Sequence, residues 1–221
     1  EPIEEIAKII KAKNPNTIFH VDAIQAYGKL PIVPKNMGID LLSTSGHKIH
    51  GPKGIGFLYI KEGTKISPII FGGGQQKGMR SGTENVPGIV GLAVACEKMI
   101  GKNYENAEKI REVKEYFQER IKEIEDIKDN SGKAPHVASI SFKKLRSEVL
   151  LHALEDREIY VSSGSACSSN KKQAVSGTLN AIALSDEFKD GTLRFSFSIE
   201  NTKEEVDETI KALKELVPML R

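Results

Sequence analysis

Hydrophobic residues along the chain recur with two spacings, which predict helices and short strands. Apolar residues at positions 3, 6, 7 and 10 follow helical spacing, and Pro2 suits the first position of a helix. Short apolar runs typical of buried strands cover residues 17–21, 39–44 and 55–60. Glycines at 72–74 and 78 indicate a loop, and a helix with one apolar face is predicted over 86–100. Strands spaced this closely after a helix indicate the later half of a mixed α/β sheet.

The second part of the chain repeats this alternation on a smaller scale. A long charged helix has a buried stripe running from Ile110 to Ile124. Strands are predicted over 137–142, 159–162 and 192–198, and a helix over 147–157. The final helix opens with a capping box formed by Thr202 and Glu205. We therefore predict a boundary near Gly101, with a small α+β domain at residues 102–221 after a first domain at residues 1–101.

Composition excludes several classes of protein. Lys and Arg number 32 against 30 Asp and Glu, a net charge of +2, which argues against a nucleic-acid partner. No apolar run approaches the roughly 20 residues that span a bilayer, so no membrane segment is expected. The two cysteines, Cys96 and Cys167, are too few for a disulfide scaffold and fit free thiols in the cytoplasm. Cys96 lies on an apolar helix face, which predicts a packing role, and no histidine spacing predicts a metal site.

A lysine follows the second predicted strand in a setting of hydroxyls and glycines. Residues 43–48 read Ser-Thr-Ser-Gly-His-Lys, and glycines recur at 51 and 54. An amine removed from water loses its proton more readily, and a neutral amine can form a Schiff base. Ser45 and His47 offer side-chain donors of the kind a phosphate needs. A surface turn with a solvated Lys48 is the alternative, and the lysine alone favours it.

A carboxylate follows the first predicted strand. Asp22 comes directly after residues 17–21, and Gln25 lies three residues further on. A carboxylate at the end of a buried strand is costly unless it meets a cation, and a protonated pyridine nitrogen is one such cation. The alternative is that Asp22 caps the next helix, which Asp22 alone favours.

Taken together, the motifs resemble a known family. The matching stretches are His-Val-Asp-Ala-Ile-Gln-Ala at 20–26, Ser-Gly-His-Lys at 45–48, Gly-Pro-Lys-Gly at 51–54, Gly-Gly-Gly-Gln at 72–75 and Arg-Ser-Gly-Thr-Glu-Asn at 80–85. In order and spacing they closely resemble the NifS/IscS-type cysteine desulfurases, fold-type I enzymes that depend on pyridoxal 5'-phosphate (PLP). The resemblance runs over essentially the whole chain. It implies an α/β fold in which residues 1–101 form the later part of the PLP-binding large domain and residues 102–221 the small C-terminal domain.

The resemblance also implies a role for each matching residue. Lys48 would bind the cofactor covalently and later move the substrate proton, while Asp22 would pair with the pyridine nitrogen. Gln25 would hydrogen-bond the ring oxygen of the cofactor. The residues implied to hold phosphate are Ser45 and His47, with Thr83 reaching the cofactor of the other subunit of a homodimer.

A cysteine stands in a run of small polar residues, Ser-Ser-Gly-Ser-Ala-Cys-Ser-Ser at 162–169. No apolar neighbour is present to pack Cys167, so an exposed, mobile loop is expected. The thiol of an exposed cysteine has a pKa of about 8.5, and a modest fall would make it a useful thiolate. An incidental cysteine is the alternative. The run resembles the catalytic loop of group I desulfurases, which implies that Cys167 takes the substrate sulfur as a persulfide.

The last candidate is Arg194, on the polar face of the strand at 192–198. A guanidinium can hold a carboxylate through two parallel hydrogen bonds, although a solvated strand arginine is the alternative. The resemblance implies that Arg194 anchors the α-carboxylate of L-cysteine. It further implies L-alanine as the product and a sulfur-acceptor protein as partner, either an iron–sulfur scaffold or a thiolation protein.

Three other functions stay open at this point. A selenocysteine lyase or an aminotransferase would share the fold, although an aminotransferase has no need of the thiol. A non-catalytic subunit is the third. The family is longer at its N-terminus, where it carries a glycine-rich phosphate loop, a histidine that stacks on the cofactor and an asparagine. None of these has a counterpart here, so we expect the chain to represent the later part of a desulfurase.

Overall fold

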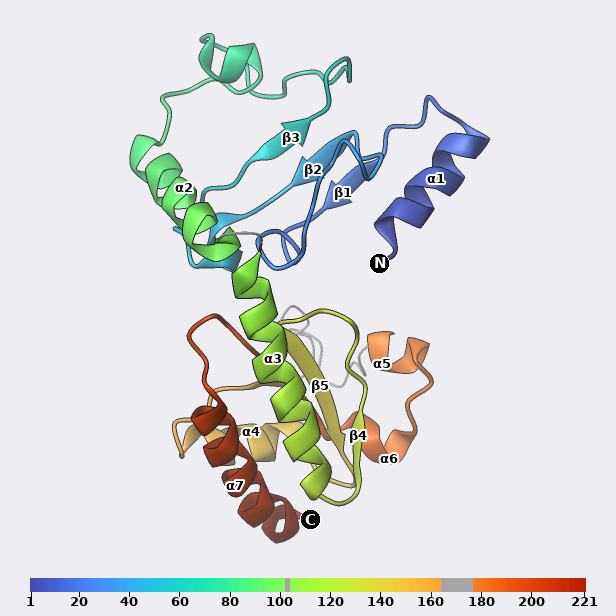
Figure 1. Cartoon of the computed structure of the whole chain (residues 1–221), viewed down its shortest axis with the longest axis vertical. Helices are drawn as coiled ribbons and strands as arrows, with labels where there is room; N and C mark the ends of the chain where they lie inside the picture. Colours follow the sequence, from blue (N-terminus) through green and yellow to red (C-terminus); the bar gives the residue numbers. More distant parts are fainter. Residues whose placement is uncertain (102–103, 164–176) are drawn as a thin grey trace. The chain divides into compact units, whose positions relative to one another are not determined.

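The computed structural model describes residues 1–101, 104–163 and 177–221. The chain divides into two compact units, Glu1–Asn106 and Ala107–Arg221 (Figure 1). The boundary predicted at residue 101 lies just before this division. Each unit has a sheet of its own and is described separately.

The first unit is built around a three-stranded sheet. Its elements are α1 (Ile3–Lys13), β1 (His20–Asp22), β2 (Leu41–Ser43), the 3-10 turn η1 (Gly46–Ile49), β3 (Leu58–Ile60), the 3-10 turn η2 (Gln75–Gly78) and α2 (Val86–Ile100). The strand order is β1-β2-β3, with β1 parallel to β2 and β2 antiparallel to β3. In Figure 1 these strands lie between α1 and α2.

The paired strands are shorter than the apolar runs predict. Before β1, side chains supply part of the bonding: Lys11 Nζ donates to the Thr17 carbonyl, and the Phe19 N–H donates to Asp40. The Phe19 carbonyl still accepts from the Leu41 N–H of β2. After β2, extended bonding continues past the strand end, since the Thr44 N–H donates to the Phe57 carbonyl. The apolar runs therefore mark extended backbone correctly but overestimate how much of it belongs to the regular ladder.

One face of this sheet is covered and the other is open. Val21, Leu42 and Tyr59 lie on the covered face, in a core that also contains Ile39 and Ala23. Because successive strand residues point to opposite faces, His20, Asp22 and Ser43 share the open face. Chemistry-bearing side chains are thus gathered on the face that the core leaves free.

A buried carboxylate ties α1 to the sheet. Asp40 is 5% exposed and accepts hydrogen bonds from Lys11 Nζ at 2.5 Å, the Phe19 N–H at 2.9 Å and Lys61 Nζ at 3.2 Å. Burial by itself would raise the pKa of Asp40, but these three donors outweigh it and lower the pKa to about 2. The charged form of Asp40 is therefore the one that the folded unit stabilises.

Replacing Asp40 with Asn is expected to destabilise the first unit by about 2 kcal/mol at pH 7, because each unit of pKa shift corresponds to about 1.4 kcal/mol. The folded pKa is depressed, so the contribution is present above about pH 4 and is lost as the pH falls toward 2. Urea unfolding of wild type and Asp40→Asn at several pH values measures this. Glu62→Gln, which changes an exposed acid, is the control. Equal stability of wild type and Asp40→Asn at pH 7 would contradict the assignment.

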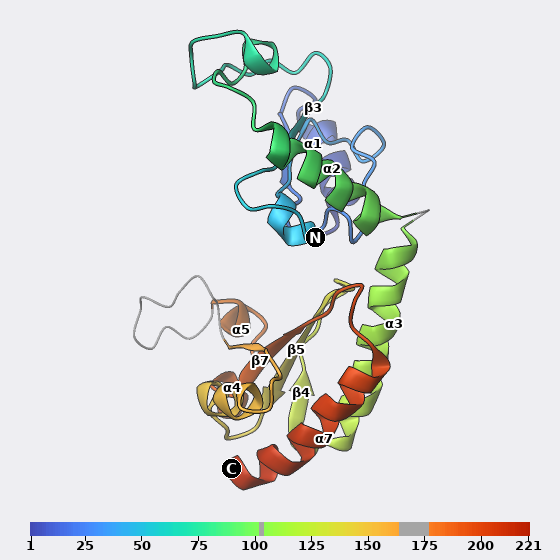
Figure 2. The ribbon, with the colours of Figure 1, turned by 90° about the vertical axis from the view of Figure 1, so that its left-hand side faces the viewer.

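The second unit is a four-stranded antiparallel sheet with helices packed on it. Its elements are α3 (Glu105–Arg120), the 3-10 turn η3 (Ile121–Glu123), β4 (Ile127–Asp129), β5 (Val137–Phe142), α4 (Ser147–Glu155), β6 (Ser162–Ser163), α5 (Gly177–Ala181), α6 (Asp186–Lys189), β7 (Thr192–Ser196) and α7 (Lys203–Leu220). The strand order is β4-β5-β7-β6. Figure 2 shows α3 and α7 lying along the sheet.

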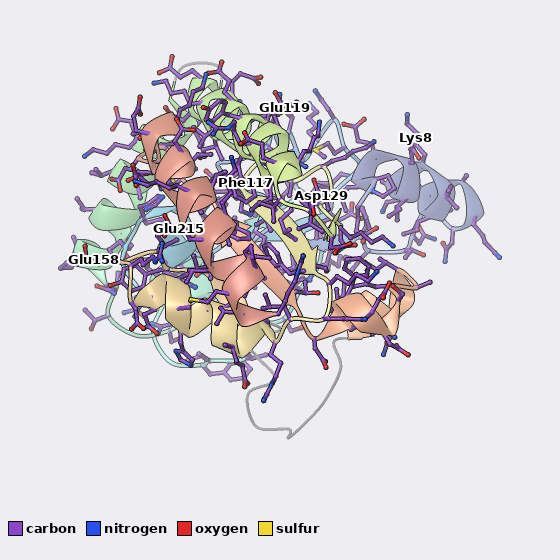
Figure 3. The ribbon with its side chains drawn as sticks, turned by 90° about the horizontal axis from the view of Figure 1, so that it is seen from below. Lys8, Phe117, Glu119, Asp129, Glu158 and Glu215 are labelled. Atoms are coloured by element: carbon purple, nitrogen blue, oxygen red, sulfur yellow. The ribbon has the colours of Figure 1, made fainter. Side chains whose placement is uncertain are left out.

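The core of this unit follows the predicted helical stripes. Phe117 and Ile121 are 1% exposed and pack with Ile140, Leu193 and Leu213 in one cluster. Phe117 points inward from α3, whereas Glu119 on the same helix points outward (Figure 3). The buried stripe predicted from Ile110 to Ile124 is confirmed, although the regular α-helix ends at Arg120.

Several predictions for single elements of the second unit are confirmed, and one is wrong. Thr202 and Glu205 form the predicted capping box at the start of α7. Strand β5 has the predicted bounds, and on β7 Leu193 and Phe195 are buried while Arg194 is exposed. The strand predicted at 159–162 is wrong in its bounds: β6 covers Ser162–Ser163, and Ile159 and Val161 pack against the core before pairing with β7 begins.

Candidate functional site

Two strand ends bring the candidate residues of the first unit to one edge of the sheet. Strands β1 and β2 are parallel, with Asp22 opposite Ser43. Parallel strands end at the same edge, so Asp22 and the segment that leaves β2 lie side by side there. That segment carries Ser45, His47 and Lys48.

A tight turn holds Lys48. The Gly46 N–H donates to the Ile55 carbonyl at 2.8 Å, and the Gly51 N–H donates to the Gly46 carbonyl at 2.9 Å. A Cβ at Gly46 would meet the Pro52 carbonyl oxygen and Ile55 Cγ2 at 3.1 Å each, so glycine suits this close approach. Lys48 lies within η1 and is half-buried. The turn therefore presents the lysine on a fixed backbone.

Helix α2 packs directly on this turn. A Cβ at Gly91 would lie 2.6 Å from Pro52 Cγ, and a Cβ at Gly51 would lie 3.1 Å from Ala95 Cβ. Helix and turn are thus in contact at two glycines, Gly91 on α2 and Gly51 after the turn. Because these residues have no side chains, α2 can pack closely against the segment that carries Lys48.

Two side chains of the turn form a polar pair. Ser45 Oγ and His47 Nδ1 are 2.7 Å apart. Ser45 is half-buried and His47 is exposed, so their remaining hydrogen-bonding capacity faces outward from the turn. This pair is suited to binding an anion such as a phosphate.

Asp22 ends β1 with an exposed carboxylate. Its Oδ1 accepts a hydrogen bond from the Ile24 N–H at 2.9 Å, which closes a turn after the strand. Gln25 follows in the same turn and is exposed. Asp22 therefore closes a local turn, where the alternative expected a helix cap, and also presents a carboxylate at the shared strand edge.

The sequence does not predict a second lysine close to Lys48. Lys29 is 7% exposed, and burial lowers its pKa to about 8, with the positive charge of Lys48 adding to the shift. Among the described residues, its ammonium has no hydrogen-bond or ion-pair partner. The only local signal is Gly28, whose φ of +76° marks a turn and which leaves room for Ile49 and Met99.

Cys96 is half-buried on α2, in accord with the predicted packing role. Its thiol contacts the phenol of Tyr27, and burial, followed by this contact, raises the pKa of Tyr27 well above its ordinary value. The phenol of Tyr27 therefore remains protonated near neutral pH.

The remaining candidates do not join this edge within the first unit. Thr83 is exposed in the loop between η2 and α2. Arg194 is exposed on β7 of the second unit, where its Nη2 donates to Ser162 Oγ at 3.1 Å. Cys167 lies outside the described residues.

The described ranges contain neither a cluster of metal ligands nor a helix able to span a membrane. In residues 1–101, 104–163 and 177–221, no three His, Cys, Asp or Glu side chains are grouped closely enough to hold a metal ion. Within the same ranges, no helix combines the length and the apolar character that crossing a membrane requires.

Comparison with known proteins gives consistent matches. Residues 1–209 match the family described as Aminotransferase class-V. Cysteine desulfurase IscS of Dictyoglomus turgidum is 40% identical over 225 residues, covering 100% of this chain and 56% of the relative. Cysteine desulfurase IscS of Clostridium botulinum is 41% identical over 227 residues, with the same coverage. A solved structure titled NifS-like protein matches with a TM-score of 0.87 and 35% identity, over 99% of this chain and 57% of that one.

These matches establish the fold class of the chain and the share of its relatives' length that it covers. Likeness to solved structures over nearly the whole chain confirms the α/β fold class that the sequence predicts. The chain spans a little over half the length of the curated relatives it matches.

Proposed function

Because the chain belongs to the aminotransferase class-V family, we propose that it supplies the catalytic residues of a PLP-dependent cysteine desulfurase. The reaction removes sulfur from L-cysteine, leaving L-alanine and a persulfide on Cys167. The observation that carries the proposal is the placement of Asp22 and Lys48 at one edge of a parallel strand pair. The motif resemblance to cysteine desulfurases is confirmed by relatives that carry this name.

The donor set of the first unit fits PLP. Lys48 offers an amine for the aldehyde, Asp22 a carboxylate for the pyridine nitrogen, and Ser45 with His47 a polar pair for the phosphate. Gln25, in the turn after Asp22, would donate to the ring oxygen. When bound, the cofactor draws electrons away from the α-carbon of the substrate. Asp22 contributes by stabilising the positive charge on the ring nitrogen.

Lys48 would have a second task during turnover. Its amine would accept the α-proton of L-cysteine and hold it for return to the product. The half-burial of Lys48 on a fixed turn limits the positions of this amine. The turn thus contributes orientation, which is a large part of the catalytic effect of such groups.

Sulfur transfer requires two residues of the second part of the chain. Arg194 would hold the substrate carboxylate through two parallel hydrogen bonds. The Cys167 thiolate would then attack the substrate sulfur, forming an S–S bond while the C–S bond breaks. The electron pair of that C–S bond stays on the substrate carbon, which a proton converts into alanine. No net oxidant or reductant is consumed in this step.

The same proposal includes partners and location. A sulfur-acceptor protein, either an iron–sulfur scaffold or a thiolation protein, would take the persulfide sulfur from Cys167. Thr83 would reach the cofactor phosphate of the other subunit in a homodimer, and its exposure in a loop is compatible with such a contact. The free Cys96 thiol is compatible with a reducing, cytoplasmic setting.

The function is tested by supplying the purified chain with PLP, L-cysteine and a thiol reductant. We expect alanine and sulfide in equal amounts, because the reductant releases the persulfide sulfur. L-Alanine in place of L-cysteine is the blank for sulfide. Transfer of an amino group to an added 2-oxo acid, without sulfide, would contradict the proposal and favour an aminotransferase. A much faster reaction with L-selenocysteine would favour the lyase.

A further inference from the structure

The open face of the first sheet carries two polar side chains that the proposed function has not used. His20 and Ser43 share this face with Asp22, since Val21 and Leu42 are directed into the core. Ser43 is the direct partner of Asp22 in the parallel pair. Neighbouring strands lie about 4.8 Å apart, so the Ser43 hydroxyl and the Asp22 carboxylate are within reach of each other.

The Ser43 hydroxyl is bonded to His20 and not to Asp22. Ser43 Oγ and His20 Nε2 are 2.7 Å apart, a normal length for a hydrogen bond. His20 pairs with Leu41, two positions before Ser43 on the same face of β2, so the imidazole leans along the sheet to reach the hydroxyl. This hydrogen bond joins β1 to β2. It engages the Ser43 hydroxyl, the neighbouring polar group that could otherwise donate to the Asp22 carboxylate.

Asp22 is left with one bound and one free carboxylate oxygen. Oδ1 accepts from the Ile24 N–H, whereas Oδ2 has no hydrogen-bond or ion-pair partner in the residues described. A hydroxyl donating to Oδ2 would draw the carboxylate toward β2 and reduce its strength as an acceptor. The free oxygen is the one that a protonated ring nitrogen would need.

We propose that His20 is a positioning residue that holds the Ser43 hydroxyl away from Asp22, so that the Asp22 carboxylate stays available for the cofactor ring nitrogen. This inference rests on the proposed function for its ligand. In it the Ser43 hydroxyl donates to His20 Nε2, and the proton of the neutral imidazole sits on Nδ1. His20 acts through Ser43 and touches neither cofactor nor substrate.

Four proteins test the inference: wild type, His20→Leu, His20→Gln and the double variant His20→Leu/Ser43→Ala. The first readout is the ¹³C chemical shift of the Asp22 carboxyl group in the chain without PLP. We expect His20→Leu to move this resonance, because the released hydroxyl turns to Asp22. Gln can place a side-chain nitrogen or oxygen where Nε2 lies, so His20→Gln is expected to keep the wild-type shift. The double variant removes the competing hydroxyl and is expected to restore it.

The second readout is the dissociation constant for PLP, from titration of its visible absorbance. His20→Leu is expected to weaken binding about tenfold, the usual effect of losing one hydrogen bond to a charged group. The double variant is expected to bind nearly as tightly as wild type. A purely structural role for His20 predicts that the double variant is at least as weak as His20→Leu, and that result would overturn the inference.

The two readouts separate this inference from the proposed function. If wild type takes up no PLP, the proposed function fails, while the Asp22 resonance still decides the hydrogen-bond arrangement without cofactor. If PLP binds at Lys48 and the Asp22 resonance is the same in wild type and His20→Leu, the inference fails and the proposed function stands.

Discussion

Lys48→Ala is expected to abolish covalent attachment of PLP and all formation of alanine and sulfide. The Lys48 amine is the only primary amine on η1, so its removal takes away the group proposed to attach to the aldehyde. Reduction with borohydride followed by mass spectrometry of the peptide containing residue 48 measures the attachment. Wild type should carry the reduced cofactor on this peptide, and Lys48→Ala should carry none.

Lys53→Ala is the matched control, because Lys53 lies in the same glycine-rich segment and is exposed. It should retain both the label and turnover. Lys29 is the competing site for attachment, since it is the buried lysine whose pKa the charge of Lys48 helps to lower. Label found on Lys29 in the wild-type protein would contradict the assignment of Lys48.

Cys167→Ser is expected to abolish sulfide and alanine formation from L-cysteine while leaving the visible absorbance of the bound cofactor intact. A hydroxyl is a far weaker nucleophile than a thiolate toward sulfur, so the C–S bond of the substrate would not break. The first proton transfer, which involves Lys48, does not need the thiol. Absorbance spectra before and after addition of L-cysteine, together with alanine analysis, measure both expectations.

Cys96→Ala is the control for this variant, because it removes the other thiol of the chain, which is half-buried against Tyr27. Sulfur transfer should persist in Cys96→Ala, with at most a modest loss of stability. Alanine formed at the wild-type rate by Cys167→Ser would refute the role of Cys167. Loss of the cofactor absorbance would place the cysteine at the cofactor instead.

Helices and caps are the features that the sequence predicts best. The bounds of α2 and β5 and the capping box of α7 agree with prediction, because each depends on neighbours within a few residues. Strand β4 is not predicted at all. It has only three residues, with Ile127 as its one apolar side chain, and it exists through its pairing with β5. Such pairing depends on residues far along the chain, which periodicity does not report.

In the candidate site, too, residues in short motifs are predicted from the sequence, and residues that depend on distant packing are not. Asp22, Ser45, His47 and Lys48 stand in short motifs, so chemistry and spacing identify them. Lys29 is missed because an isolated lysine is usually exposed, whereas this one is 7% exposed through tertiary packing that no local motif reports. The role inferred for His20 needs the register of two strands, since only the pairing places Ser43 opposite Asp22.

The contact between Gly91 and Pro52 determines how a substitution at position 91 would affect this chain. Position 91 is on a helix, where alanine is ordinarily the most favourable residue and glycine among the least. Here a methyl group would overlap Pro52 Cγ, so the usual helix-strengthening substitution would displace the loop that leads back to the lysine. A survey that ranks helix glycines by propensity would select Gly91 for improvement. The outcome would be a shifted amine and impaired chemistry, with no change at any residue of the reaction itself.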